Sequence, residues 1–333
     1  MDIGAHALTS FTLARGFFPR KGWQLMVGMV AAGTLADVDL LSRFFGPAAY
    51  LVAHRTWTHS VLGTIVVIVI GAILTLRLER PKKNPLSLIL TAMACAAGAH
   101  LLLDLFQSEG VMLLWPVRAT RYAADWLPNV DGWLLALLLA GILFPELFRL
   151  VGSEIGAKDK NPRGRNGAIV VLTLIVVYIA ARGILRSSSM ALLEPRTYQR
   201  ESPRRMGSFP DALSIFTWHG VVETESLICL VDVPVGPGKG FDPETANCLH
   251  KPETSPALIA AQGTATVEAF LQVARFPRAA VVRTEDGYEV TIRSMRDQAE
   301  GQTHSRVATQ VMLDGKLKVL SEELVWGKDL RVK

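Results

Sequence analysis

Apolar and polar positions divide the chain into two parts of different character. Long apolar runs follow one another over residues 1–186, whereas residues 187–333 alternate apolar and polar positions over short distances. The apolar runs cover residues 3–18, 23–36, 60–76, 86–106, 132–150 and 167–185. Several are shorter than the roughly 20 residues of a lone spanning helix, but they are rich in Gly and Ala, as closely packed membrane helices are. We therefore expect a mostly α polytopic membrane helix bundle over residues 1–186. Core helices of a soluble protein are the alternative.

The second part of the chain predicts a soluble α+β domain over residues 187–333. Strands are expected over 214–223, 227–235, 279–284, 288–295, 307–313 and 316–320, and a helix over 256–274. Asp286-Gly287 and Asp314-Gly315 separate the last two pairs of strands, which is a hairpin signal. The three cysteines include no CxxC pair. Cys229 and Cys248 could form a disulfide if this domain lies in an oxidising compartment.

Charge adds an orientation to the predicted bundle. The formal net charge is +5, but the basic residues gather in short loops at 15–21, 77–83 and 158–165. Six alternating crossings put these three loops on one side, which the positive-inside rule makes cytoplasmic. We therefore expect a multi-pass protein of the bacterial inner (cytoplasmic) membrane with its C-terminal domain outside. The distribution does not suit a nucleic-acid surface, and nothing in it indicates an oligomeric state.

Histidines and carboxylates of four apolar segments fall at one depth. At about 1.5 Å per helical residue they lie roughly 18–27 Å from the basic ends of their helices, close to the outer edge of a core about 30 Å thick. The candidate metal ligands are His6, Asp37, Asp39, His54, His59, His100 and Asp104. His100 and Asp104 are four residues apart and share one helix face.

This mixture of nitrogen and oxygen donors indicates a divalent metal. Zinc is favoured, manganese or iron also fits, and no thiolate competes. Seven ligands exceed the needs of one ion, so we expect two ions about 3.5–4 Å apart, bridged by a carboxylate.

Each of these residues also has a purely structural explanation. A lone histidine on an apolar helix is usually a hydrogen-bonded packing residue. Asp37 could cap the next segment, His100 and Asp104 could form an intrahelical pair, and His59 could merely precede a helix cap at Ser60. These explanations would have to hold separately for residues that converge at one depth, so we favour the shared site.

Two further polar residues leave a choice open. Arg55 is either an anchor whose side chain reaches the membrane surface or a clamp on an anionic oxygen. Asp131, beside Gly132, is either a helix N-cap or an acid that supports the ligands, and we favour the cap.

The order of these motifs resembles a known family. Its pattern runs through an opening Met-Asp-x-x-x-His, Leu35-Ala36-Asp37-Val38-Asp39, His54-Arg55-x-x-Thr58-His59-Ser60 and His100-x-x-x-Asp104. In this order and spacing it is similar to the YdjM-like inner-membrane proteins, which are metal-dependent hydrolases of bacteria. Where the family often has proline after Val130-Asp131, this chain has Gly132. The resemblance implies a membrane location, a metal and hydrolysis, without a substrate.

We expect hydrolysis of a phosphoester or ester in a lipid or lipid-linked substrate by metal-activated water. His59 or Asp39 would carry the proton, and Arg55 would hold the phosphate. The depth of the site is the reason to expect lipid. Neither His-Glu-x-x-His nor Gly-x-Ser-x-Gly occurs, which disfavours these protease and serine-hydrolase chemistries. The rival is a non-catalytic membrane metalloprotein that senses metal or acts as a scaffold for an envelope complex. A transporter ranks last, because the polar groups lie away from the midplane.

Overall fold

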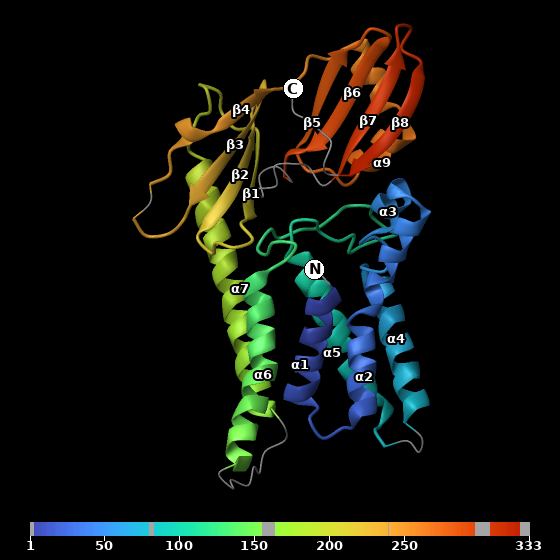
Figure 1. Ribbon diagram of the computed structural model, residues 1–333, viewed down its shortest axis with the longest axis vertical. Helices are drawn as coiled ribbons and strands as arrows, with labels where there is room; N and C mark the ends of the chain where they lie inside the picture. Colours follow the sequence, from blue (N-terminus) through green and yellow to red (C-terminus); the bar gives the residue numbers. More distant parts are fainter. Residues whose placement is uncertain (1–2, 80–82, 155–163, 239, 297–306, 327–333) are drawn as a thin grey trace. The chain divides into compact units, whose positions relative to one another are not determined.

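Helices form over each of the predicted apolar runs (Figure 1). The computed structural model describes residues 3–79, 83–154, 164–238, 240–296 and 307–326. Its first helices are α1 (Ile3–Phe17), α2 (Trp23–Ala32), the 3-10 helix η1 (Leu35–Phe45), α3 (Pro47–Ala53), α4 (Val61–Leu78), α5 (Leu86–Leu105), α6 (Gly132–Glu154) and α7 (Arg165–Leu193). The basic residues predicted at 80–82 and 158–163 lie outside the described residues.

Four helices of the described residues, α4 to α7, are long and apolar enough to cross a membrane by length and composition. The bent pair of α2 and η1 makes a fifth if it is one span. α1 has 15 residues and is shorter than these helices. The predicted helix bundle is confirmed, with four or five candidate spans where the sequence suggested six crossings.

Small residues allow the helices of the bundle to approach closely. One apolar core joins α1, α2, α4 and α5 through residues such as Met29, Val67 and Met93. A Cβ atom on Gly28 would lie 1.9 Å from the hydroxyl of Thr75, and one on Gly71 would lie 2.9 Å from the Cβ of Ala32. Glycine is therefore required at both contacts between α2 and α4. A second apolar core joins α6 and α7 to α1 and α5.

The second predicted helix ends earlier than its apolar run. α2 stops at Ala32, and Gly33 donates its backbone N–H to Met29 and Ala31 at the C-cap. The chain continues in η1 at an angle of 46° to α2. η1 buries Asp37 and Asp39 on one side and exposes Val38 and Leu41 on the other. The break therefore delivers two carboxylates to the interior of the bundle.

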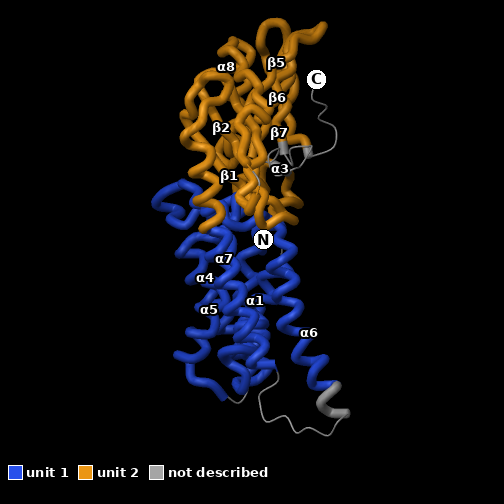
Figure 2. The backbone as a smooth tube through the Cα atoms, turned by 90° about the vertical axis from the view of Figure 1, so that its left-hand side faces the viewer, with its two compact units in different colours: residues 1–41, 53–183 blue, residues 42–52, 184–333 orange. Residues whose placement is uncertain are grey.

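The chain divides into two compact units (Figure 2). The first comprises Met1–Leu41 and Ala53–Gly183, and the second comprises Ser42–Val52 and Ile184–Lys333. Helix α7 contributes to both units, because the division falls between Gly183 and Ile184.

The second unit contains two antiparallel four-stranded sheets with helices α8 (Pro256–Gln262) and α9 (Ala265–Leu271), so the predicted α+β domain is confirmed. One sheet orders β1 (Arg205–Pro210), β2 (Thr217–Glu223), β3 (Leu227–Pro234) and β4 (Asn247–His250). The other orders β5 (Pro277–Arg283), β6 (Gly287–Ser294), β7 (Val307–Asp314) and β8 (Val319–Trp326), with α8 and α9 in contact with it.

Some details of this domain differ from the sequence prediction. The helix expected over 256–274 is two helices, because the chain turns at Gly263 and Thr264 between α8 and α9. β1 and β4 were not predicted. Cys229 on β3 lies opposite Cys248 on β4, and the two form a disulfide.

Candidate metal centre

Five of the seven predicted ligands meet inside the bundle. His6 comes from α1, Asp37 from η1, His59 from the loop before α4, and His100 and Asp104 from the last turns of α5. All five residues are buried, with exposed fractions between 0% and 6%. Segments that lie far apart in the sequence therefore supply one polar cluster in an otherwise apolar bundle.

Four of these residues have the arrangement of a metal site. Ligand atoms of His6, Asp37, His100 and Asp104 all lie within 4.8 Å of one another, which is the one such group among the residues that the structure describes. His59 lies at its edge, because its Nε2 atom is 3.0 Å from Asp104 Oδ2 and 3.0 Å from His100 Nε2. The same atom is 3.6 Å from Asp37 Oδ1. Five side chains thus direct nitrogen or oxygen atoms at a common volume.

Contacts at the edge of the cluster hold the ring of His100 in place. His100 Nδ1 is 2.8 Å from the carbonyl oxygen of Gly33, and a hydrogen bond from Nδ1 leaves Nε2 with a free lone pair. The His100 ring stacks on His6 with 3.8 Å between the ring centroids. Helix α5 and the residue that follows α2 therefore fix the direction in which His100 faces.

Some of the buried polar atoms lack hydrogen-bond partners within the described part of the chain. They include both ring nitrogens of His6 and the Oδ2 atom of Asp37, although His6 Nε2 is 3.3 Å from Asp104 Oδ1. Buried polar atoms without hydrogen bonds are costly unless an ion or water satisfies them. This donor set fits a divalent cation held by imidazole and carboxylate.

Asp39 and His54 lie behind the cluster. Asp39 Oδ2 accepts hydrogen bonds from the backbone N–H of Arg55 at 2.7 Å and from the Thr58 hydroxyl at 3.0 Å. Its Oδ1 atom is 3.2 Å from His54 Nδ1. Asp39 also reaches the outer ring nitrogen of His59, at 3.2 Å between Oδ2 and Nδ1. The geometry therefore gives these two residues a supporting place around the loop that carries His59.

Arg55 is buried, with 3% of its surface exposed, so it is not an anchor that reaches the membrane surface. Its Nη2 atom donates to Gln107 Oε1 at 2.7 Å and to Asp104 Oδ1 at 3.2 Å. Its Nη1 atom is 3.4 Å from Glu109 Oε2. The backbone of Arg55 has a φ of 57°, a conformation that L-residues rarely adopt. The loop thus directs the guanidinium into the cluster.

Three residues support the cluster in ways that the sequence analysis did not predict. Thr58 bonds Asp39 and lies 2.9 Å from His59 Nδ1. Gln107 and Glu109 hold Arg55, and Glu109 Oε2 is also 3.7 Å from His54 Nε2. The available signal was the polar run Gln107-Ser108-Glu109, which follows Asp104 directly at the end of an apolar helix.

Two predicted helix caps are present. The Ser60 hydroxyl accepts the backbone N–H of Gly63 at the start of α4. Asp131 Oδ1 accepts the backbone N–H of Leu134 at the start of α6, and its Oδ2 accepts the hydroxyl of Tyr178. Asp131 is a cap, and His59 directly precedes the cap at Ser60.

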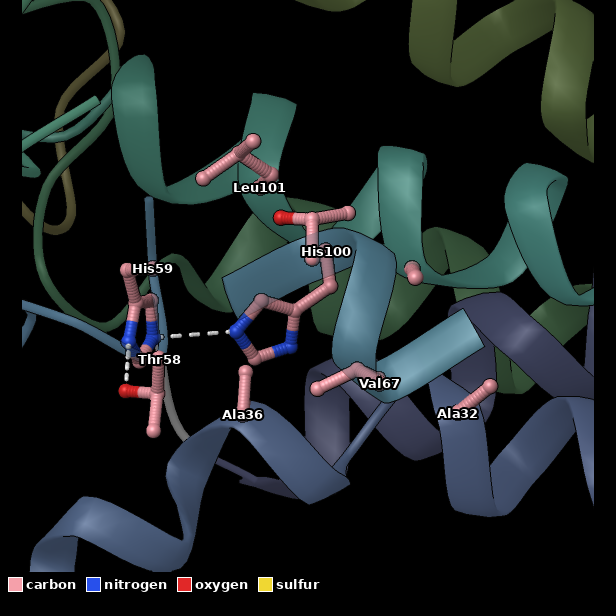
Figure 3. A pocket seen from close by; sticks show the side chains of 9 residues that line it. Ala32, Ala36, Thr58, His59, Val67, His100 and Leu101 are labelled. Atoms are coloured by element: carbon pink, nitrogen blue, oxygen red, sulfur yellow. Dashed lines mark hydrogen bonds between the residues drawn. The ribbon is translucent and has the colours of Figure 1, made fainter. Parts of the chain in front are cut away.

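A narrow pocket adjoins the cluster (Figure 3). Its lining residues come from α2, η1, the loop before α4, α4 and α5, and they are Ala32, Ala36, Thr58, His59, Thr64, Val67, Ala97, His100 and Leu101. In Figure 3 the His59 and His100 rings face each other at one end, with Ala36 beside them and Val67 and Ala32 further away. The pocket thus has one polar end and largely apolar walls.

A helix bundle with apolar spans and a buried His/Asp cluster able to hold a metal ion defines the class, a membrane protein with a candidate metal centre. The chain belongs to the YdjM inner membrane protein family, whose profile matches residues 1–188 and so includes every residue of the cluster. No curated protein and no solved structure matches the chain.

Proposed function

We propose that the protein is a membrane-embedded, metal-dependent hydrolase of the inner membrane that cleaves a phosphoester or ester in a lipid or lipid-linked substrate. The observation that carries the proposal is the convergence of His6, Asp37, His100 and Asp104 within 4.8 Å inside a membrane bundle. Burying ionisable side chains inside a membrane costs free energy, so their presence there is the mark of a functional site.

His6, Asp37, His59, His100 and Asp104 would hold the metal. Zinc is the preferred ion for this mixture of imidazole and carboxylate, and manganese or iron is compatible with it. We propose two ions, because the buried site and its surroundings contain four carboxylates (Asp37, Asp39, Asp104 and Glu109) but one guanidinium, that of Arg55, so negative charge is in excess. When bound, such ions lower the pKa of a coordinated water and polarise the scissile oxygen.

The protein's own groups provide a route for the proton. Carboxylates and imidazoles alternate from Glu109, through His54 and Asp39, to His59, with separations of 3.7, 3.2 and 3.2 Å. The Glu109 and His54 side chains are 25% and 14% exposed, while those of Asp39 and His59 are fully buried. We assign Asp39 to proton transfer at the buried end of this route, where it contacts the outer ring nitrogen of His59.

Arg55 is proposed to stabilise negative charge. Its guanidinium already lies against Asp104, which keeps that carboxylate oriented toward the imidazoles. To clamp an anionic oxygen of the substrate as well, Arg55 would exchange its contact with Gln107 or Glu109.

The lipid substrate is supported by the surroundings of the cluster. α4 and α5, which contribute to the pocket, are candidate membrane spans, and their outward side chains Ile65 and Leu102 are 52% and 53% exposed. An amphiphile that diffuses in the bilayer has direct access to this face.

We further propose that the C-terminal domain is extracytoplasmic. The Cys229–Cys248 disulfide supports this side, because disulfides persist in oxidising compartments and are rare in the cytoplasm. The basic residues at 15–21, with Arg77 and Lys83, support a cytoplasmic location for the opposite ends of the helices.

The test is turnover in vesicles. Purified protein is reconstituted into vesicles of bacterial envelope lipids with Zn²⁺ or Mn²⁺, and released phosphate, headgroup and fatty acid are measured by mass spectrometry. We expect product from the wild type, none after chelation, and none from His59→Ala, which removes a side chain that would hold the metal. Wild-type protein that holds metal yet releases no product from any of these lipids contradicts the hydrolase.

One observation favours the second candidate, a non-catalytic metalloprotein that senses metal or serves as a scaffold. The pocket beside His59 and His100 is too narrow for a water molecule, as a coordinatively closed site would require. A metal-loaded protein in which added water exchanges freely at the ion, detected by electron–nuclear coupling on bound Mn²⁺, favours the hydrolase over this candidate.

A further inference from the structure

The connection between α5 and α6 contains a closed loop with an exposed apolar tip. Val111 and Tyr122 form the base of this loop, and each donates its backbone N–H to the carbonyl oxygen of the other at 2.9 Å. The turn between them carries Leu114, Trp115 and Val117, whose exposed fractions are 46%, 38% and 91%. Large apolar side chains gathered at one place on a surface mark a site of contact with another molecule or with a membrane.

The loop is joined to the first residue of a candidate membrane span. The backbone N–H of Val61, at the start of α4, donates to the carbonyl oxygen of Leu113 at 3.0 Å. α4 has 18 residues and is therefore about 27 Å long, close to the roughly 30 Å of a hydrocarbon core. Val61 and Leu62 are 45% and 54% exposed, so the outward surface of the span continues up to this end of α4. Leu113 therefore lies near the boundary between hydrocarbon and lipid headgroups.

The composition of the loop suits this boundary. Residues 111–124 contain no Asp or Glu and two arginines, Arg118 and Arg121. Tryptophan, here Trp115, is enriched at membrane–water boundaries, because its ring is apolar and its N–H is polar. Arg118 is exposed, and its guanidinium matches the phosphate of a lipid headgroup in charge and shape. Apolar side chains beside an exposed cation are the combination that binds the surface layer of a bilayer.

The base of the loop is also bonded to the segment that carries His59. The backbone N–H of Met112 donates to the carbonyl oxygen of Arg55 at 3.1 Å. The Nη2 atom of Arg121 donates to the carbonyl oxygen of His54 at 2.8 Å. Two consecutive residues of the metal-site segment are therefore held by the loop, so the depth of the loop in a bilayer and the position of this segment are linked.

We propose that residues 112–121 form an interfacial anchor, which inserts Leu114, Trp115 and Val117 at the headgroup–acyl boundary of a phospholipid bilayer and places Arg118 among the phosphates. The partner is the lipid surface itself. The anchor fixes the depth at which the candidate metal centre meets the bilayer. This inference goes beyond the proposed function, because a hydrolase and a non-catalytic metalloprotein would use the anchor equally.

The experiment measures the depth of nitroxide labels on single cysteines, in full-length Cys95→Ser protein reconstituted into vesicles of phosphatidylcholine and phosphatidylglycerol. Val117→Cys reports on the tip of the anchor. Leu213→Cys, at an 84% exposed position of the C-terminal domain, is the control for water, and Ile65→Cys, at a 52% exposed position of α4, is the control for hydrocarbon. Collisions of the label with oxygen become more frequent with depth in a membrane, and collisions with a water-soluble nickel chelate become rarer. We expect the ratio of oxygen to nickel collisions at Val117 to exceed that at Leu213 and to stay below that at Ile65.

A second pair of variants tests the link to the metal-site segment without a label. Val117→Asp should expel the tip from the bilayer and increase deuterium exchange at residues 54–60. Thr120→Asp, at another exposed position of the same loop, should leave that exchange unchanged, because it removes no large apolar side chain. Equal exchange in the two aspartate variants would contradict the link. A collision ratio at Val117 equal to that at Leu213 would place the tip in water, and protection from both collision partners would show that protein covers it; either result overturns the anchor.

Discussion

His100 and His54 are both histidines near the site, but their different surroundings give them different roles. The Nδ1 atom of His100 lies against a backbone carbonyl and its Nε2 faces the cluster, whereas both nitrogens of His54 face carboxylates, those of Asp39 and Glu109. Spacing along the sequence predicted that both would lie near the site, because helical rise fixes depth. It could not separate them, because the partners of His54 depend on how its loop folds, and the left-handed backbone at Arg55 in that loop has no glycine to mark it.

Replacing Asp39 by asparagine should weaken metal binding without abolishing it. Its oxygens hold the loop through Arg55 and Thr58, so the change acts on the orientation of His59 rather than on the inner group. Loss of such a supporting carboxylate typically lowers metal affinity by about 10–100-fold. Competitive titration with a chromogenic chelator measures the affinity, with His219→Ala, in the C-terminal domain, as the control. If Asp39→Asn retains no metal at saturating concentration, Asp39 is a ligand itself.

At the scale of elements, the ends of the helices matter more for the site than their middles. The apolar runs predicted α1, α2 and α4 to α7, because hydropathy is a property of the whole segment, but they did not predict η1 or α3. They did not predict the break after Ala32, since residues 33–36 carry no charge and the apolar run continues to Asp37. In the C-terminal domain the turn signals predicted two hairpins, while the four-residue strand β4 was too short to show a pattern.

Ser60→Ala should destabilise the bundle by about 1 kcal/mol, the usual loss when an N-cap hydroxyl is removed. Ser60 directly follows His59, and its hydroxyl accepts the N–H of Gly63 in the first turn of α4. Denaturation in mixed micelles measures the change. Ser188→Ala is the control, because the hydroxyl of that exposed serine donates to the carbonyl of Ile184 within its own helix α7. An equal effect of the two substitutions would show that the cap does not stabilise α4.

Glu201 should make the turn between β2 and β3 sensitive to acid. Hydrogen bonds from the Ser226 hydroxyl, the Thr224 hydroxyl and the Ser226 N–H lower the pKa of Glu201 from its ordinary 4.5 to about 2. A lowered pKa in the folded state means that the stabilisation is present above pH 4.5 and disappears as the pH falls toward 2. Hydrogen exchange at residues 224–227 of the full chain should thus show less protection in Glu201→Gln than in the wild type at pH 7, and a smaller difference at pH 3. The same difference at both pH values would argue against the carboxylate as the cause.

The whole molecule combines a family-defined membrane unit with a domain beyond the family match. The profile of the family ends at residue 188, close to the end of α7. Composition alone predicted that the membrane part of the chain ends near residue 186, because membrane and soluble segments differ in hydropathy along their full length. What the C-terminal domain does could not be derived from its residues, since His219 pairs with Asp211 and Asp232 and its histidines form no ligand cluster in the sequence.

The orientation of the chain can be tested with single cysteines in a Cys95→Ser background. We expect Leu213→Cys, which replaces an 84% exposed leucine of the C-terminal domain, to react with a membrane-impermeant maleimide in intact spheroplasts. Asn84→Cys, in the loop before α5, should react only after permeabilisation, because that loop belongs to the basic side. The Cys229–Cys248 pair should stay unlabelled until it is reduced. The reverse order of labelling for the two introduced cysteines would place the domain in the cytoplasm.

Elemental analysis of protein purified without chelators tests the central claim most directly. The shared centre predicts at least one equivalent of a divalent transition metal in the wild type, and near-complete loss in His100→Ala and in His59→Ala, whose Nε2 atoms lie 3.0 Å apart within the cluster. His219→Ala, which removes a histidine outside the cluster, should retain the wild-type amount. Metal content that is unchanged in the two cluster variants, or absent from the wild type after loading, would contradict the account.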